Sequence, residues 1–380
     1  MTLFSKNKSI IGIDIGADSV KMVELVKEQG KPKLVTYGVA EDSIDIVRDN
    51  SPESTAKLVY IIKQIISESR MKGKSVIAAL PTFSVFSSIL SLPNMPKKDL
   101  AQAVRWEAKK FVPMPLEEMI LDWKLLKSLD DLKQEREKGK SSEASDTEIP
   151  DDKNDLKQSL DNDQEKSKSS HLRVLITAAP KNLVSRYVDV VKSADLQLDS
   201  LETEAFAVTR SIVGNQKGSV MIVDIGSITT DIMIIEDGIP ILNRSIDVGG
   251  KTLTHAIAQS LHVDVARAEQ FKRDIGVSLS GSSAIPRVMK QTLQPILQEI
   301  TYSHNLYLSQ TNQPVEKIVL TGGSAMLPGM DQFLAETTNI NTYTGDPWQN
   351  VSYQDELKPV VDEIGSRLPV AIGLALRPLD

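Results

Sequence analysis

Short apolar runs and longer amphipathic segments alternate along most of the chain. The apolar runs predict β-strands at residues 9–13, 21–26, 75–80, 173–177, 220–223, 231–235 and 317–320. Segments with apolar residues at helical spacing predict helices at residues 52–70, 97–111, 181–194, 252–261 and 285–310. This alternation of strands and helices predicts the α/β class.

One segment, residues 127–170, differs from the rest in composition. It holds nine basic and thirteen acidic residues among 44 positions, and only six apolar ones. Because so few apolar side chains cannot offset the entropy cost of ordering the segment, we expect a disordered loop. We interpret it as a tolerated insertion rather than as a dedicated binding arm.

A thirteen-residue pattern occurs twice, at residues 11–23 and 221–233, which are 210 residues apart. The repeat aligns Asp14 with Asp224 and Gly16 with Gly226. Each copy predicts a β-hairpin with a tight Asp-Ile-Gly turn that opens one lobe of the protein. A single such turn is ordinarily a plain hairpin turn, but two copies predict two similar lobes with a cleft between them.

The repeated turns carry groups that suit a phosphate chain and a metal ion. Glycine in a turn lets backbone amides approach a phosphate closely. Asp14 and Asp224 could hold a hydrated Mg²⁺, which prefers one or two carboxylates together with water and phosphate oxygens. Lys21 could meet phosphate charge, and Asp231 occupies the equivalent place in the second copy. Hydroxyl groups that could add hydrogen bonds are those of Ser19, Thr229 and Thr230.

Two Gly-Gly turns offer further backbone contacts. Gly322-Gly323 follows the last predicted strand, where adjacent glycines permit close contact with a flat base or a phosphate. Gly249-Gly250 opens a helix and offers a similar approach. Gly250-Lys251-Thr252 looks like the end of a Walker A loop, but Ser245 stands where that motif requires glycine, which disfavours a P-loop NTPase.

Composition narrows the class of protein further. The absence of cysteine excludes disulfides, thiolate metal sites and cysteine nucleophiles, and the four histidines lie too far apart to predict a zinc site. A net charge of −7 with 4% aromatic residues disfavours nucleic-acid binding. No apolar run approaches the roughly 18 residues of a membrane span. We therefore expect a cytoplasmic protein without redox chemistry.

Taken together, the motifs resemble the actin-like ATPase superfamily, which includes actin, the seventy-kilodalton chaperones, sugar kinases and the cell-division protein FtsA. Closer still, residues 10–25, 201–211, 246–272, 318–330 and 369–379 look like the PilM family of type IV pilus assembly. The resemblance implies a two-lobed actin-like, ribonuclease H-like fold with a small inserted subdomain of the FtsA type. It also implies that the cofactors are ATP and Mg²⁺.

The resemblance assigns a role to each matching residue. Glu204 matches an acidic residue that helps to position water near the γ-phosphate, so it joins Asp14 and Asp224 as a candidate catalytic group. Glu269 and Lys272 match positions that hold the ribose and the base, although their spacing alone also fits an exposed helical pair. The other matching residues would bind phosphate or adenosine: Gly16, Ser19, Lys21, Gly226, Thr229, Thr230, Gly249, Gly250, Gly322, Gly323 and Ser324.

The resemblance also predicts the domain boundaries and a partner. We expect the inserted subdomain to take the N-terminal cytoplasmic tail of PilN, an inner-membrane partner, in an apolar groove or at a strand edge. Trp106 and Phe111 lie in this part of the chain, and we expect them to belong to its core rather than to the groove. The predicted parts are a first lobe at 1–78, 181–217 and 364–380, an inserted subdomain at 79–180 and a second lobe at 218–363.

Membrane attachment is expected only through partners. FtsA ends in a basic amphipathic helix, whereas this chain ends at Arg377-Pro378-Leu379-Asp380, so PilN and other inner-membrane assembly proteins would recruit it to the inner face of the membrane. We expect an ATP-dependent scaffold or switch with slow or absent hydrolysis, and self-association is a further option. The alternatives are an FtsA-like filament protein, a chaperone-like ATPase and a small-molecule kinase on the same fold.

Overall fold

The computed structural model describes residues 9–42, 49–126, 171–278 and 284–379, and the chain divides into two compact units. Unit 1 comprises Met1–Val85 and Pro180–Asp380, and unit 2 comprises Phe86–Ala179. The loop predicted at residues 127–170 lies outside the described residues. Each unit has its own sheet structure and its own core.

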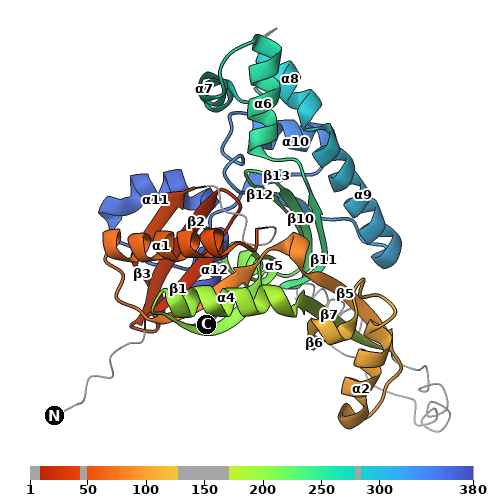
Figure 1. The fold of residues 1–380 in the computed structure, drawn as a ribbon. Coiled ribbons are helices and arrows are strands. Elements are labelled where there is room, and N and C mark those ends of the chain that lie inside the picture. Colours follow the sequence, from red (N-terminus) through yellow and green to blue (C-terminus); the bar gives the residue numbers. More distant parts are fainter. Residues whose placement is uncertain (1–8, 43–48, 127–170, 279–283, 380) are drawn as a thin grey trace, which may run out of the picture. The chain divides into compact units, whose positions relative to one another are not determined.

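Unit 1 begins with a five-stranded mixed sheet in the order β3-β2-β1-β4-β8 (Figure 1). The first three strands form an antiparallel meander, and β4 and β8 add to it in parallel. All six residues of β1 are buried, which explains why this strand is an almost continuous apolar run. The bounds are β1 Ile10–Ile15, β2 Ser19–Glu28, β3 Lys31–Glu41, β4 Ser75–Leu80 and β8 Gln197–Thr203.

A second five-stranded sheet in unit 1 repeats this arrangement, in the order β11-β10-β9-β12-β13. Asp14 lies opposite Lys21 in the first hairpin (β1–β2), and Asp224 lies opposite Asp231 in the second hairpin (β9–β10). The internal repeat predicted from the sequence is therefore present as two equivalent hairpins. The bounds are β9 Ser219–Ile225, β10 Thr230–Glu236, β11 Ile239–Ile246, β12 Lys317–Thr321 and β13 Thr342–Thr344.

Helices cover the first sheet. α1 (Pro52–Glu68) and α4 (Lys181–Ser193) pack on each other and lie along one side of it (Figure 1). α12 (Pro369–Leu376) contacts β1, β2 and β4, and a Cβ atom on Gly12 would lie 1.9 Å from the carbonyl oxygen of Ala371, so only glycine permits this approach. α5 (Glu204–Val208) and α12 share one hydrophobic core with residues of both sheets.

The second sheet has its own set of helices and its own core. A single predicted helix at 285–310 is wrong: the segment forms two helices that break at Leu293. Pro295, the second residue of the second helix, has no amide hydrogen with which to continue the hydrogen-bond pattern of the first. The bounds are α6 Gly250–Leu261, α7 Val265–Ile275, α8 Ala284–Thr292, α9 Gln294–Thr311, α10 Met330–Thr338 and α11 Lys358–Ile364. The shorter helical turns are η1 Thr82–Ser84, η3 Thr209–Val213, η4 Asp355–Leu357 and η5 Gly365–Arg367.

The described residues of unit 2 form a three-stranded sheet in the order β5-β7-β6, one helix and a short helical turn. The prediction that Trp106 and Phe111 are core residues is wrong, because their exposed fractions are 70% and 50%. The buried face of the helix instead carries Leu100, Val104 and Ala108, at helical spacing, and Trp106 lies on the other face. The bounds are β5 Phe86–Leu92, α2 Lys97–Ala108, η2 Leu116–Glu118, β6 Met119–Leu126 and β7 Leu172–Pro180.

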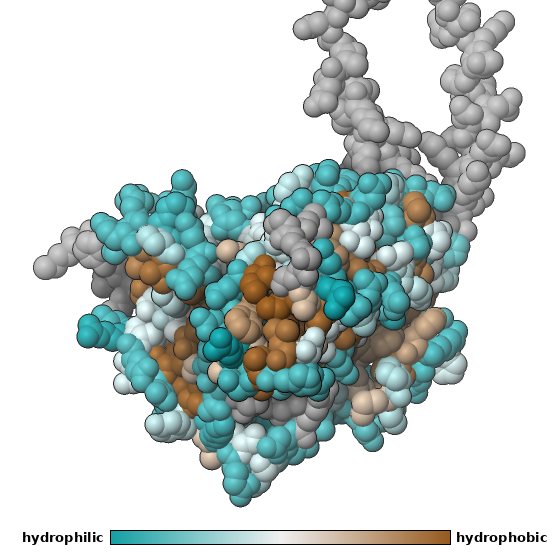
Figure 2. Space-filling view, turned by 90° about the horizontal axis from the view of Figure 1, so that it is seen from above, coloured by the Kyte–Doolittle hydropathy of each residue, from teal (hydrophilic) through white to brown (hydrophobic). Residues whose placement is uncertain are grey.

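One face of the molecule is shown in space-filling form in Figure 2, where hydrophilic residues predominate and hydrophobic residues gather in a few patches. Most of the large apolar side chains that the structure describes are instead buried in hydrophobic cores. Within the described part of the chain, no helix combines the length and the apolar character that crossing a membrane requires.

Candidate functional site

A cavity of about 670 Å³ in unit 1 brings most of the predicted binding residues together. Its volume is typical of a site for a small molecule or cofactor. The lining comes from both hairpins, from α6 and α7, and from the turn after β12. The predicted residues that line it are Asp14, Ser19, Lys21, Asp224, Gly226, Gly250, Glu269, Lys272, Gly322, Gly323 and Ser324.

The two hairpin turns close with the same hydrogen bond. The amide of Gly16 donates to the carbonyl of Ser19, and the amide of Gly226 donates to the carbonyl of Thr229, each at 2.9 Å. Gly16 and Thr229 are not among the residues that line the cavity. These glycine amides therefore hold the turns in shape.

Thr230 also faces away from the cavity, contrary to its predicted role as a phosphate donor. Its side chain is fully buried, and its hydroxyl donates to the carbonyl of Val248 at 2.6 Å. Alternation along β10 explains the difference, because Asp231, the next residue, points to the opposite face of the sheet. The hydroxyl of Thr230 therefore links β10 to Val248, in the segment just before α6 begins.

Lys21 is the cation of the first hairpin. Its Nζ atom lies 2.9 Å from Oδ2 of Asp14, directly across the strand pair. Burial by itself would lower the pKa of Lys21, but the charges of Asp14, Asp224 and Glu204 outweigh it and raise the pKa above 10.5. Lys21 is thus held as a cation among several carboxylates, where it can also meet a phosphate.

The second hairpin has a carboxylate where the first has Lys21. Burial, only partly offset by Lys21 and reinforced by the charge of Asp14, raises the pKa of Asp224 to about 6. Burial and the charge of Asp224 raise the pKa of Asp231 to about 7. This group of carboxylates fits a hydrated Mg²⁺, since Asp14 and Asp224 both line the cavity and a cation beside Asp224 would favour its ionised form. Mg²⁺ bound there would supply charge neutralisation to a phosphate chain.

Glu204, the predicted water-positioning residue, lies at the N-terminus of α5 but not in the cavity lining. Its Oε2 atom accepts hydrogen bonds from the amide and the hydroxyl of Thr82, at 2.7 and 2.9 Å. Burial, followed by the charges of Asp231 and Asp14, raises its pKa well above the ordinary value. Thr82 therefore fixes the position of Glu204 close to the carboxylates of both hairpins.

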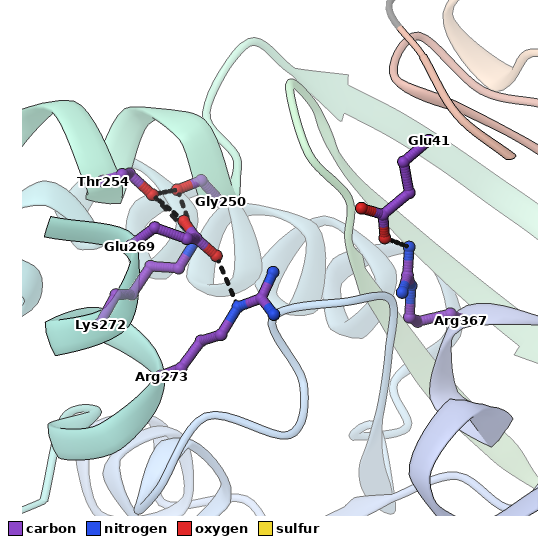
Figure 3. A network of polar contacts seen from close by, with 7 residues as sticks. All are labelled: Glu41, Gly250, Thr254, Glu269, Lys272, Arg273 and Arg367. Atoms are coloured by element: carbon purple, nitrogen blue, oxygen red, sulfur yellow. Dashed lines mark hydrogen bonds and ion pairs between the residues drawn. The ribbon is translucent and has the colours of Figure 1, made fainter. Parts of the chain in front are cut away.

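Glu269 and Lys272 form the centre of a polar network between α6 and α7, drawn in Figure 3. Lys272 is only 6% exposed, and its Nζ atom contacts Glu269, the hydroxyl of Thr254 and the carbonyl of Gly250, at 2.7, 2.9 and 3.1 Å. Burial would raise the pKa of Glu269, but hydrogen bonds from Lys272, Thr254 and Arg273 lower it to about 2. The alternative of an exposed helical pair is therefore wrong for Lys272.

The Gly249-Gly250 turn packs directly on the second hairpin. The amides of Gly250 and Lys251 donate to the carbonyls of Gly226 and Ser227, at 2.9 and 2.8 Å. A Cβ atom on Gly249 would lie 2.6 Å from the carbonyl oxygen of Ser227, so the close packing requires glycine. The amides of Gly250 and Lys251 are therefore already hydrogen-bonded to the second hairpin, and Gly249 is not part of the cavity lining.

The Gly322-Gly323 turn is tight on one side and open on the other. Gly322 has a φ of +88°, and a Cβ atom there would lie 2.4 Å from the carbonyl oxygen of Ile225 and 2.5 Å from Oδ1 of Asp224. Beside Gly323 there is open space, with no atom within 4 Å of an added Cβ. Met326 and Val370 add apolar surface to the same cavity, which suits a flat base.

Several cavity residues were not predicted from the sequence. Asp18 and Lys251 lie within the compared motifs, beside predicted residues, but were given no role in the site, and they form an ion pair at 2.6 Å. Arg273 follows Lys272 in the same helix, so its helical position was the available signal. Glu41 and Arg367 form another ion pair, at 2.6 Å, away from the Glu269 network (Figure 3). Since these two residues are 326 positions apart, no local pattern could have paired them.

Two similar lobes, each opening with an Asp-Ile-Gly hairpin that lines a common cavity, define an actin-like ATPase fold. MreB5 of Spiroplasma citri, solved with bound ADP, has this fold, with a TM-score of 0.50 and 16% identity over 96% of this chain and 94% of that one. The chain belongs to the family described as type IV pilus assembly protein PilM, which it matches over residues 12–138 and 157–379.

The chain is also similar to a solved structure and to a cell division protein. The chain is similar to a solved PilM–PilN type IV pilus biogenesis complex, with a TM-score of 0.76 and 25% identity over 98% of each chain. It is 24% identical over 226 residues to the cell division protein FtsA of Neisseria meningitidis serogroup B. That match covers 53% of each protein, so the chain spans about half the length of the curated relatives it matches.

Proposed function

We propose that the chain is the ATP-binding component of a type IV pilus or a related secretion or DNA-uptake machine, and that it binds the N-terminal tail of PilN. The family supports the assembly role, and the similar solved structure is a complex of PilM with PilN. Attachment to the cytoplasmic face of the inner membrane would then come through PilN.

The observation that carries the nucleotide part of the proposal is the grouping of the two hairpins and the Glu269–Lys272 network around one cavity. The hairpins would take the phosphates, with Lys21 as a cation and Asp14 and Asp224 beside the metal ion. Lys272 and Glu269 would hold the ribose, and the base would lie at Gly323 and the apolar residues near it. The two ends of the cavity thus suit the two ends of ATP.

Unit 2 offers an apolar surface for the peptide tail. Trp106 and Phe111 are exposed, and Met114 and Ile120 of the same unit are exposed as well. An exposed apolar patch marks an interaction site, and Trp is enriched among the residues that supply most of the binding energy at such sites. We therefore place the PilN tail on this surface, with Trp106 as its main anchor.

Calorimetric titration tests the proposal as a whole. Purified full-length chain is titrated with Mg·ADP or a Mg-bound non-hydrolysable ATP analogue, and with a synthetic PilN N-terminal peptide, each in the presence and absence of the other. A nucleotide switch predicts that the two ligands change each other's affinity by the same factor. Asp224→Ala should remove the nucleotide response and keep peptide binding. Absence of nucleotide binding by the unmodified chain would contradict the proposal.

A separate variant tests the peptide surface. Trp106→Ala should weaken peptide binding by about tenfold or more, because truncating a central aromatic residue of an interface typically costs about 2 kcal/mol. The matched control is Tyr60→Ala, since Tyr60 is an aromatic residue of α1 with a similar exposed fraction of 67%. Equal peptide affinity of Trp106→Ala and Tyr60→Ala would rule out this surface.

A further inference from the structure

Asp18 joins the two hairpins across the cavity. It lies in the turn of the first hairpin, and its Oδ2 atom accepts a hydrogen bond from the hydroxyl of Ser227 in the turn of the second hairpin. Its other oxygen, Oδ1, lies 2.6 Å from Nζ of Lys251 in the first turn of α6. The Asp18 side chain is only 15% exposed, whereas that of Lys251 is 50% exposed.

The groups that Asp18 holds are those expected to meet the end of a phosphate chain. Ser227, in the turn of the second hairpin, and Lys251, in the first turn of α6, both line the cavity. The two hairpins are expected to hold the phosphates, so the last phosphate would lie between the two turns. A hydroxyl and an ammonium group are suitable donors to a phosphate oxygen, as they are to a carboxylate.

A carboxylate in this position therefore competes with a terminal phosphate and repels it. A diphosphate need not reach the donors that Asp18 occupies. A triphosphate must either displace Asp18 from Ser227 and Lys251 or lie next to its negative charge, and both cost binding free energy. Asp18 therefore weakens the binding of ATP more than the binding of ADP.

We propose that Asp18 determines the phosphate specificity of the site: its carboxylate takes the place of a terminal phosphate, holds the two hairpins together in the nucleotide-free chain, and disfavours ATP relative to ADP. This inference rests on the nucleotide site proposed above.

The test compares Asp18→Asn with the unmodified full-length chain. Asn keeps the size of the side chain and removes its charge. Titration with Mg·ADP and with a Mg-bound non-hydrolysable ATP analogue should show that the affinity ratio shifts toward the triphosphate by about tenfold or more. The matched control is Asp274→Asn, because Asp274 is an exposed residue of α7 outside the cavity lining and its replacement changes the net charge equally. Its ratio should change by less than about twofold.

Amide hydrogen exchange of the nucleotide-free chain supplies a second measurement. Asp18→Asn should speed exchange in residues 14–20 and 224–230, because the contact that joins the two turns is weakened. An unchanged affinity ratio, or unchanged exchange in both turns, would overturn the inference about Asp18. Failure of the unmodified chain to bind either nucleotide would instead contradict the proposed nucleotide site, so the two failures are distinguishable.

Discussion

Replacement of Asp231 by Asn is expected to stabilise the nucleotide-free protein, and to do so more at pH 8 than at pH 5. Asp231 lies directly opposite Asp224 in the second hairpin, where the first hairpin has a lysine. Its Oδ1 atom is buried and has no hydrogen-bond partner among the described residues. Ionisation of Asp231 in the folded chain is therefore unfavourable, and Asn removes this cost while keeping the shape of the side chain.

The magnitude follows from the pKa of Asp231, which burial and the charge of Asp224 raise from 3.8 to about 7. Because the pKa is higher in the folded chain, stability is lost as the pH rises from about 4 to about 7, and the full cost is present above pH 7. The difference corresponds to an upper limit of about 4 kcal/mol at pH 8 and about 2 kcal/mol at pH 5. Since the folded chain can relax around the charge, we expect about half of these values.

The assay is urea denaturation of the nucleotide-free chain, without divalent cations, at pH 8 and at pH 5. Asp274→Asn serves as the control, because Asp274 is an exposed residue of α7 and its replacement changes the net charge equally. The control should change the free energy of unfolding by less than about 0.5 kcal/mol. The reasoning is refuted if Asp231→Asn does not stabilise the chain at pH 8, or if its effect is equally large at pH 5.

Two further predictions concern the cavity. Gly322→Ala should lower the free energy of unfolding by about 2–4 kcal/mol, because the φ of Gly322 is +88° and an added Cβ would meet the backbone. In the same urea titration, the control Gly323→Ala should change the free energy of unfolding by less than about 0.5 kcal/mol, because the space beside Gly323 is open. Glu269→Gln should lower it by about 1–2 kcal/mol at pH 7, after allowance for partial exposure of the side chain. The pKa of Glu269 is lowered to about 2, so this stabilisation is present above about pH 4.5 and fades as the pH falls toward 2. A deficit of equal size at pH 7 and pH 3 would contradict this interpretation.

The first and second hairpins were predictable because both rest on local patterns. Each is an apolar run, a tight Asp-Ile-Gly turn and a second apolar run, and strand pairing across a short turn needs no information from distant residues. The repeat in turn predicted two similar lobes. Helix ends were less predictable, as the break at Leu293 shows. A single proline that lacks an amide hydrogen can divide an otherwise continuous helical pattern into two helices.

The direction in which side chains point was the main source of error in the predicted site. Thr230 carries a suitable hydroxyl, but strand alternation turns it away from the cavity. Trp106 is apolar, but its position on α2 places it on the exposed face. Residue type alone gives the chemistry of a side chain, and the backbone decides what that side chain meets.

The fold class, the two equivalent hairpins and eleven of the residues that line the cavity could be predicted from the sequence, because they depend on local periodicity and on short motifs. Only the tertiary structure decided that Asp18 reaches Ser227 and Lys251, which follow it by 209 and 233 positions. It likewise decided that Asp231 lies among the carboxylates whose charges shift one another's pKa values. Electrostatic interactions depend on distance in space and on burial, and neither quantity is written in the spacing of residues along the chain.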